Sequence, residues 1–196
     1  MSSKRIGIDL DNTLIDYSTT AKIYAQKRGI QGIENLADLR IHLRKVSDLQ
    51  WRRAQAWIYT SGLEFAEPAK GLHFFLESLS SSNSAMFIVS HKTRFSSIDD
   101  GKQDLHQHAL RWIEFKLRPE DLNRISNIFF EPTREAKLSR IQSLNLWAFI
   151  DDLPEVLRDP GFPKGVRRIL YDPYGYYKST ESLCTVNSLS KVELHD

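Results

Sequence analysis

The sequence contains five short apolar runs, rich in β-branched and aromatic residues, that alternate with stretches of helical pattern. Near-continuous apolar character is typical of strands buried on both faces, as in a parallel sheet covered by helices. Strand, helix and strand in repetition predict an α/β fold with a doubly wound parallel sheet. The expected strands span residues 5–8, 85–89, 127–130, 146–150 and 166–171.

Residues 17–70 interrupt this alternation, because they contain no strand-like run. We therefore expect a small helical cap at 17–70, inserted after the first strand into a core domain formed by 1–16 and 71–196. The expected cap helices span 21–28, 33–45 and 49–60, with Gly29, Gly32 and Gly62 as breaks. The expected core helices span 72–79, 104–117 and 134–144, and the serine-rich stretch 78–84 is expected to form a loop.

The composition narrows the functional classes. The 196 residues carry 27 Lys and Arg against 25 Asp and Glu, so no chain-wide nucleic-acid surface is expected. The single cysteine, Cys184, excludes an internal disulfide and a zinc site of the CxxC kind. No apolar run approaches a membrane span, and the first residues lack a secretory pattern. We expect a cytoplasmic monomer or homodimer that binds neither nucleic acid nor a membrane.

Acidic residues follow two of the expected strands. Asp9 and Asp11 come directly after the first strand, and Asp151 and Asp152 come after the strand at 146–150. Ligands of α/β sheets bind beyond the carboxyl ends of the strands, and close carboxylates repel each other unless a cation lies between them. Mg²⁺ suits such oxygen ligands. The alternative is that these aspartates cap turns or the next helix.

A hydroxyl and a lysine complete the set. Ser90 follows the strand at 85–89 and is a candidate to bind a phosphoryl oxygen, unless it only forms a turn. Lys137 lies near the start of the helix expected at 134–144, where a cation does not complement the helix dipole. It either points into an anionic site or is solvated.

Together these elements resemble the haloacid dehalogenase-like (HAD-like) hydrolase superfamily. Its pattern is DxDx[TV] after the first strand, Ser or Thr after the second, Lys before the fourth, and paired acids at the end of the fourth. The matching residues, in the same order, are Asp9-Leu10-Asp11-Asn12-Thr13, Ser90, Lys137 and Asp151-Asp152. The resemblance covers residues 4–14 and about 70–172, and it implies a HAD-like Rossmannoid core with a C1-type cap.

The resemblance implies a Mg²⁺-dependent phosphatase that hydrolyses a small phosphorylated metabolite, such as a sugar phosphate or a nucleotide. Asp9 would attack phosphorus and form an aspartyl-phosphate, and Asp11 would act as general acid and base. The metal would be bound by Asp9, by Asp11 through its backbone carbonyl, and by Asp151, with Asp152 assisting directly or through water. The phosphoryl oxygens would be held by Ser90, Lys137 and the backbone near Asn12.

Several further residues are candidates for substrate specificity. His91, Lys92 and Arg94 follow Ser90 closely enough to contact a second charge on the substrate. The stretch 172–177 is a second candidate element. The basic residues between 40 and 53 either form a solvated helix face or attract anionic substrates. Trp51, Trp57 and Tyr59 either line a pocket or pack within the cap.

Two other functions stay open from the sequence. One is a non-catalytic or regulatory HAD-like module. The other is a receiver-type domain, which is phosphorylated rather than hydrolytic and also combines acids, a hydroxyl and a lysine on a parallel sheet. The long helical insertion after the first strand argues against the receiver, and the complete set of elements argues against an inactive scaffold.

Overall fold

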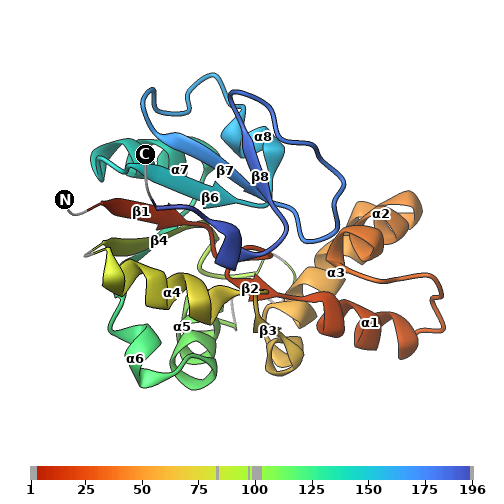
Figure 1. Ribbon diagram of the computed structural model, residues 1–196. Coiled ribbons are helices and arrows are strands. Elements are labelled where there is room, and N and C mark those ends of the chain that lie inside the picture. The colour runs from red at the N-terminus through yellow and green to blue at the C-terminus, as the bar shows by residue number, and fades with distance from the viewer. Residues whose placement is uncertain (1–3, 83, 97, 99–102, 195–196) are drawn as a thin grey trace.

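The computed structural model describes residues 4–82, 84–96, 98 and 103–194, and its centre is a six-stranded sheet (Figure 1). The strands lie in the order β5-β4-β1-β6-β7-β8, and all neighbours are parallel. Their bounds are β1 Arg5–Ile8, β4 Ala85–His91, β5 Ile125–Glu131, β6 Ala148–Asp151, β7 Arg167–Tyr171 and β8 Cys184–Val186. This arrangement confirms the predicted doubly wound α/β fold.

Helices cover both faces of the sheet (Figure 1). One face carries α4 (Leu72–Ser81), α5 (Leu105–Lys116) and α6 (Pro119–Leu122), and the other carries α7 (Arg134–Ser143) and α8 (Pro154–Leu157). Strand side chains alternate between two cores, so Ile150 packs in the cluster that contains α4 and Phe149 in the cluster that contains α7. Burial on both faces explains why the strands are apolar almost throughout.

A helical segment leaves the sheet between two very short strands. These strands, β2 (Ile15–Asp16) and β3 (Glu67–Pro68), pair in antiparallel fashion, so the outgoing and returning chain lie side by side. The segment contains α1 Ser18–Gln26, α2 Leu36–Val46, α3 Asp48–Ile58 and the 3-10 helix η1 Ser61–Phe65. Figure 1 places α2 and α3 on the side toward which the central strands point.

The sequence-based elements are largely confirmed, with two kinds of error. The strands β2, β3 and β8 were not predicted, because two or three residues are too few to show a pattern. The loop predicted at 78–84 is wrong over its first part, since α4 continues to Ser81. There Ser78 Oγ donates to the Phe75 carbonyl at 2.7 Å, which satisfies the hydroxyl inside the helix. No helix among the described residues is long and apolar enough to span a membrane.

A buried carboxylate ties α4 to the turn at α6. Asp121 accepts hydrogen bonds from His73 Nδ1 at 2.6 Å and from Arg118 Nε at 2.8 Å. Burial alone would raise the pKa of Asp121, but the bonds from Arg118 and His73 outweigh it and lower the pKa below its ordinary value. The ionised carboxylate therefore stabilises the folded state.

Asp121→Asn is expected to lower the free energy of unfolding by about 1 to 3 kcal/mol at pH 7, because the bonds to a charged acceptor are lost. A depressed pKa stabilises the fold above the unfolded value of about 4, and this stabilisation is lost as the pH falls through the folded value. The difference between the variant and the wild type should therefore shrink in acid. Urea unfolding across pH tests this.

The control for this experiment is Glu120→Gln. Glu120 lies 3.4 Å from Arg118, but its side chain is 59% exposed. Removing so exposed a charge should change the stability by less than about 1 kcal/mol. Equal effects of the two substitutions would contradict the role of Asp121.

Candidate active site

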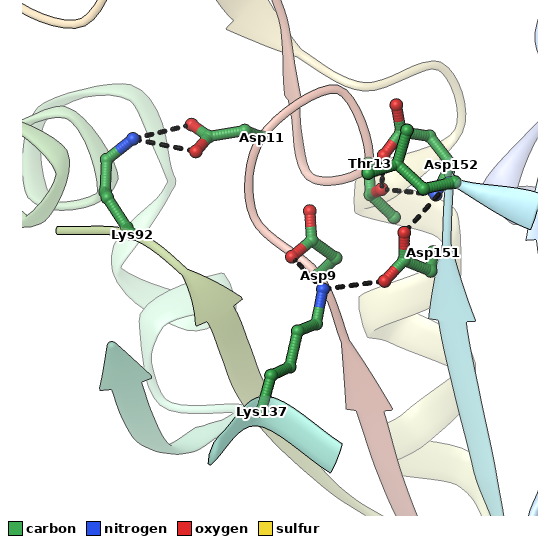
Figure 2. Close-up of polar contacts among 8 residues, drawn as sticks. Asp9, Asp11, Thr13, Lys92, Lys137, Asp151 and Asp152 are labelled. Atoms are coloured by element: carbon green, nitrogen blue, oxygen red, sulfur yellow. Dashed lines mark hydrogen bonds and ion pairs between the residues drawn. The ribbon is translucent and has the colours of Figure 1, made fainter. Parts of the chain in front are cut away.

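Lys137 lies between two aspartates at the carboxyl edge of the sheet (Figure 2). Its Nζ donates to Asp9 Oδ1 at 2.6 Å and to Asp151 Oδ2 at 2.7 Å. Asp9 follows β1, Asp151 ends β6, and Lys137 stands near the start of α7. All three residues are buried, with at most 6% of their surface exposed. The alternative prediction, that Lys137 is solvated, is therefore excluded.

The negative charges of the carboxylates in this cluster are only partly compensated by the single positive charge of Lys137. Burial raises the pKa of Asp9 to about 7; Lys137 opposes this, while Asp151 and Asp11 add to it. Burial also raises the pKa of Asp152 well above its ordinary value, and the charges of Asp151 and Asp9 raise it further. Although burial alone would lower the pKa of Lys137, Asp151 and Asp9 raise it, so the amine is a fixed cation. A second cation would stabilise the ionised aspartates.

The geometry fits a divalent cation. Asp9, Asp151 and Asp152 each offer one carboxylate oxygen, and these oxygens lie within 4.8 Å of one another. A small hard cation such as Mg²⁺ prefers oxygen ligands of this kind. The carboxylate of Asp11 is not part of this cluster, which agrees with a role for Asp11 through its backbone carbonyl but does not test it.

Asp151 and Asp152 differ in how their oxygens are used. Asp151 accepts from Lys137 through Oδ2 and from the backbone N–H of Leu153 through Oδ1, at 2.9 Å. Asp152 accepts at Oδ1 from Thr13 Oγ1 at 3.3 Å, and it lines the cavity above the cluster. The sequence left open which of Asp151 and Asp152 binds the metal directly; in the structure Asp151 also binds Lys137, and Asp152 is the one of the two that lines the cavity.

Asp11 lies apart from Asp9 although only one residue separates them (Figure 2). Lys92 Nζ donates to both oxygens of Asp11, at 3.0 and 2.7 Å, and Tyr17 Oη donates to Oδ1 at 2.6 Å. Burial raises the pKa of Tyr17 well above its ordinary value, so the hydroxyl keeps the proton that it donates. The Nζ of Lys92 also lies 3.8 Å from the ring centre of Tyr59. Asp11 is thus held by Lys92 and Tyr17, and Tyr59 lies against the Lys92 amine.

The predicted phosphate ligands surround the same place. Ser90 is 1% exposed in β4, next to β1, and Asn12 is half-buried in the turn after β1. Asn12 adopts a φ of 59°, a left-handed conformation that asparagine tolerates better than most residues. This turn directs the chain away from β1 immediately after the two aspartates. Ser90, Asn12 and Lys137 all line the cavity.

A cavity of about 900 Å³ opens above these residues. Its floor is formed by the aspartates and Lys137, and its walls come from the helical segment and from the loop after β7. The helical segment contributes Leu36, Ala37, Arg40, Ile41, Arg44, Trp51, Gln55 and Tyr59. The loop contributes Asp172, Pro173, Tyr174, Tyr176 and Tyr177. A volume of this size accommodates a small organic ligand.

The comparisons with known proteins concern the fold. Neither a family model nor a curated protein sequence matches this chain. Among solved structures, protein tyrosine kinase A of Mycobacterium tuberculosis has a TM-score of 0.61 at 13% identity, over 94% of this chain and 93% of that one. A predicted phosphatase from Clostridium acetobutylicum has a TM-score of 0.55 at 16% identity, over 87% and 85%. The HAD-hydrolase YfnB of Bacillus subtilis, solved with bound magnesium, has a TM-score of 0.54 at 10% identity, over 96% of each chain.

The chain has the HAD-like fold. One fold supports several activities, as the kinase among these matches shows, so the function has to be argued from the site. The structure brings together Asp9, Asp151, Asp152 and Lys137. Asp11, Asn12 and Ser90 line the same cavity as Asp9, Asp152 and Lys137.

The three residues predicted to contribute to specificity differ in their placement. His91 is exposed at the cavity, and its Nε2 lies 3.2 Å from the Pro132 carbonyl oxygen. Lys92 also lines the cavity, but it is buried and its amine binds Asp11. Arg94 is 63% exposed, pairs with Asp104 at 2.9 Å and is not among the described residues that line the cavity. The structure thus places His91 and Lys92 at the cavity and Arg94 away from it.

Sequence reasoning missed the residues that position the acids. Thr13 fixes Asp152, since its Oγ1 accepts from the Asp152 backbone N–H at 3.0 Å and donates to Oδ1. The DxDx[TV] pattern contains Thr13 and could have identified it. Tyr17 and Tyr59 carry no comparable signal, because their approach to Asp11 and Lys92 depends on how the helical segment packs.

Lys137→Met is expected to lower the free energy of unfolding by about 3 to 5 kcal/mol in metal-free buffer, because Asp9 and Asp151 lose their buried cation. The matched control is Lys116→Met. Lys116 pairs with Glu67 at 2.9 Å, with side chains that are 30% and 60% exposed, and its loss should cost less than about 1 kcal/mol. Urea unfolding with a chelator present measures both variants. Similar small losses in the free energy of unfolding would refute the proposed contribution of Lys137 to stability.

Proposed function

We propose that this protein is a Mg²⁺-dependent phosphatase that hydrolyses a small phosphomonoester through an aspartyl-phosphate on Asp9. The observation that carries the proposal is the gathering of Asp9, Asp152 and Lys137 at the carboxyl edge of a parallel sheet, on the floor of one cavity. Phosphoryl transfer requires positioning and charge neutralisation, and this site offers both. In this proposal residues 17–70 act as a cap that encloses the substrate.

Asp9 and Asp152 would hold the metal, while Asp151 keeps Lys137 in place. When bound, Mg²⁺ supplies positive charge that offsets the repulsion among the aspartates and the negative charge of the phosphoryl group. The remaining chemistry belongs to side chains of this chain.

Asp9 is the nucleophile in this proposal. Lys137 occupies its Oδ1, and Oδ2 has no hydrogen-bond partner among the described residues. Attack by a carboxylate oxygen forms a bond from Asp9 to phosphorus and breaks the bond to the leaving oxygen, which takes a proton from Asp11. Asp11 then accepts a proton from water as that water attacks phosphorus. The bond to Asp9 breaks, and inorganic phosphate leaves.

The other residues of the site orient the reacting groups and stabilise the charge that develops on the phosphoryl oxygens. Ser90 and Lys137 provide donors for the phosphoryl oxygens as charge develops on them. Lys92 and Tyr17 hold the Asp11 carboxylate at the cavity before the substrate enters. These contacts stabilise the ionised carboxylate, so Asp11 has to leave them and take up a proton from solvent before it can protonate the leaving oxygen. Tyr17 and Tyr59 link this step to the helical segment.

If Asp152 is a metal ligand, substitutions of Asp152 and of the nearby Glu155 should affect Mg²⁺ binding unequally. Asp152→Asn is expected to weaken Mg²⁺ binding about ten- to a hundredfold, because a charged ligand becomes neutral. Glu155→Gln is the control: Glu155 also lines the cavity but is exposed and lies outside the acidic cluster. Isothermal titration of each variant with Mg²⁺ makes the comparison, and equal affinities would rule out Asp152 as a ligand.

The activity is tested with p-nitrophenyl phosphate and a panel of phosphorylated metabolites, with and without Mg²⁺. Asp9→Asn should reduce kcat by about a thousandfold or more, because the nucleophile is removed. Asp11→Asn should reduce it about a hundred- to ten-thousandfold, because proton transfer is lost. An inactive wild type, or full activity in Asp9→Asn, would refute the proposal. Phosphorylated Asp9 that persists without turnover would instead indicate the regulatory function.

A further inference from the structure

Two arginines of the helical segment line the cavity far along the chain from the catalytic motifs. Arg40 and Arg44 are four residues apart on α2, so they lie on one side of the helix. Both line the cavity, together with Leu36, Ala37 and Ile41 from the same helix. The cavity therefore has acids and Lys137 on the side of the sheet and two guanidinium groups on the side of α2.

These guanidinium groups are not neutralised by strong ion pairs. In the described part of the chain, Arg40 has no carboxylate within ion-pair distance. Arg44 has one long contact, 3.8 Å from its Nε to Asp48 Oδ1, and Asp48 is bound more closely by Arg52 at 2.7 Å. A planar guanidinium without a carboxylate partner is suited to bind a carboxylate or a phosphate.

The loop after β7 adds one acid to the lining of the cavity, Asp172, and its carboxylate is already bound within the loop. Asp172 accepts the backbone N–H groups of Gly175 and Tyr177, at 3.1 and 2.7 Å. Asn35, the N-cap of α2, donates to Tyr176 Oη at 3.2 Å, which fastens the loop beside the start of that helix. Figure 1 shows the chain after β7 extending toward α2.

We infer that the substrate carries a second anionic group, which Arg40 and Arg44 bind while the phosphoryl group lies against Asp9 and Lys137. This inference rests on the proposed phosphatase function and names its substrate class: a phosphomonoester whose organic part bears a carboxylate or another phosphate. A cavity of about 900 Å³ has room for both ends of such a molecule.

Paired substrates test the inference. Glycerol 2-phosphate is compared with 2-phosphoglycerate, which adds a carboxylate, and fructose 1-phosphate with fructose 1,6-bisphosphate, which adds a phosphate. The readout is the ratio of kcat/KM for the member with the second anionic group, here called the charged member, to kcat/KM for the member without it. We expect a ratio above about ten in at least one pair, which also identifies the anion, because a charge-assisted pair of this kind contributes about ten- to a hundredfold.

Arg40→Gln should lower that ratio about tenfold or more, mainly through KM of the charged substrate, and adding Arg44→Gln should lower it further. Arg53→Gln is the control, since Arg53 is exposed on the same segment and does not line the cavity. Its ratio should equal that of the wild type.

The possible outcomes separate this inference from the function on which it rests. Hydrolysis of p-nitrophenyl phosphate without a preference for the charged members, or with a preference that Arg40→Gln retains, would overturn the inference and leave the phosphatase standing. A wild type that hydrolyses none of these esters would refute both. A preference lowered equally by Arg53→Gln would also overturn it, because it would reflect only the overall charge.

Discussion

The buried contact of Lys137 with Asp9 and Asp151 joins the three elements on which the site depends. Asp9 follows β1, Asp151 ends β6, and Lys137 comes from α7, so one amine connects two neighbouring strands and a covering helix. The Asp9 backbone N–H, bound to the Ile150 carbonyl at 2.8 Å, holds the strand ends in register. A buried charge is tolerated only when it is paired, so each member of this cluster requires the others.

A second charged pair lies beside the first and stays separate from it. Lys92 holds Asp11, while Lys137 holds Asp9, although the two aspartates are close neighbours in sequence (Figure 2). The two carboxylates have different partners because Lys92 follows β4 and Lys137 lies on α7. Carboxylates with different cations are suited to different tasks. In the proposed mechanism one attacks phosphorus and the other transfers protons.

The helical segment contributes to the site as well as covering it. Tyr17 contacts Asp11, Tyr59 lies against the Lys92 amine, and Trp51 lines the cavity, whereas Trp57 packs against Tyr24. The aromatic residues of this segment thus divide between the two roles that the sequence left open. Arg40 and Arg44 place positive charge at the same cavity, opposite the aspartates.

The sequence by itself determined the α/β class and the five longer strands, and it placed Asp9, Ser90, Asp151 and Asp152 at strand ends, because buried strands and the polar residues that end them are local patterns. It left open whether Lys137 is solvated, which its contacts with Asp9 and Asp151 decide. Only the tertiary structure decided which carboxylates share a cation. Asp9 binds Lys137 and Asp11 binds Lys92, although only one residue separates the two aspartates. The partners of Lys92 and the cavity surface of Arg40 depend on contacts between segments far apart in the chain, which no local pattern encodes.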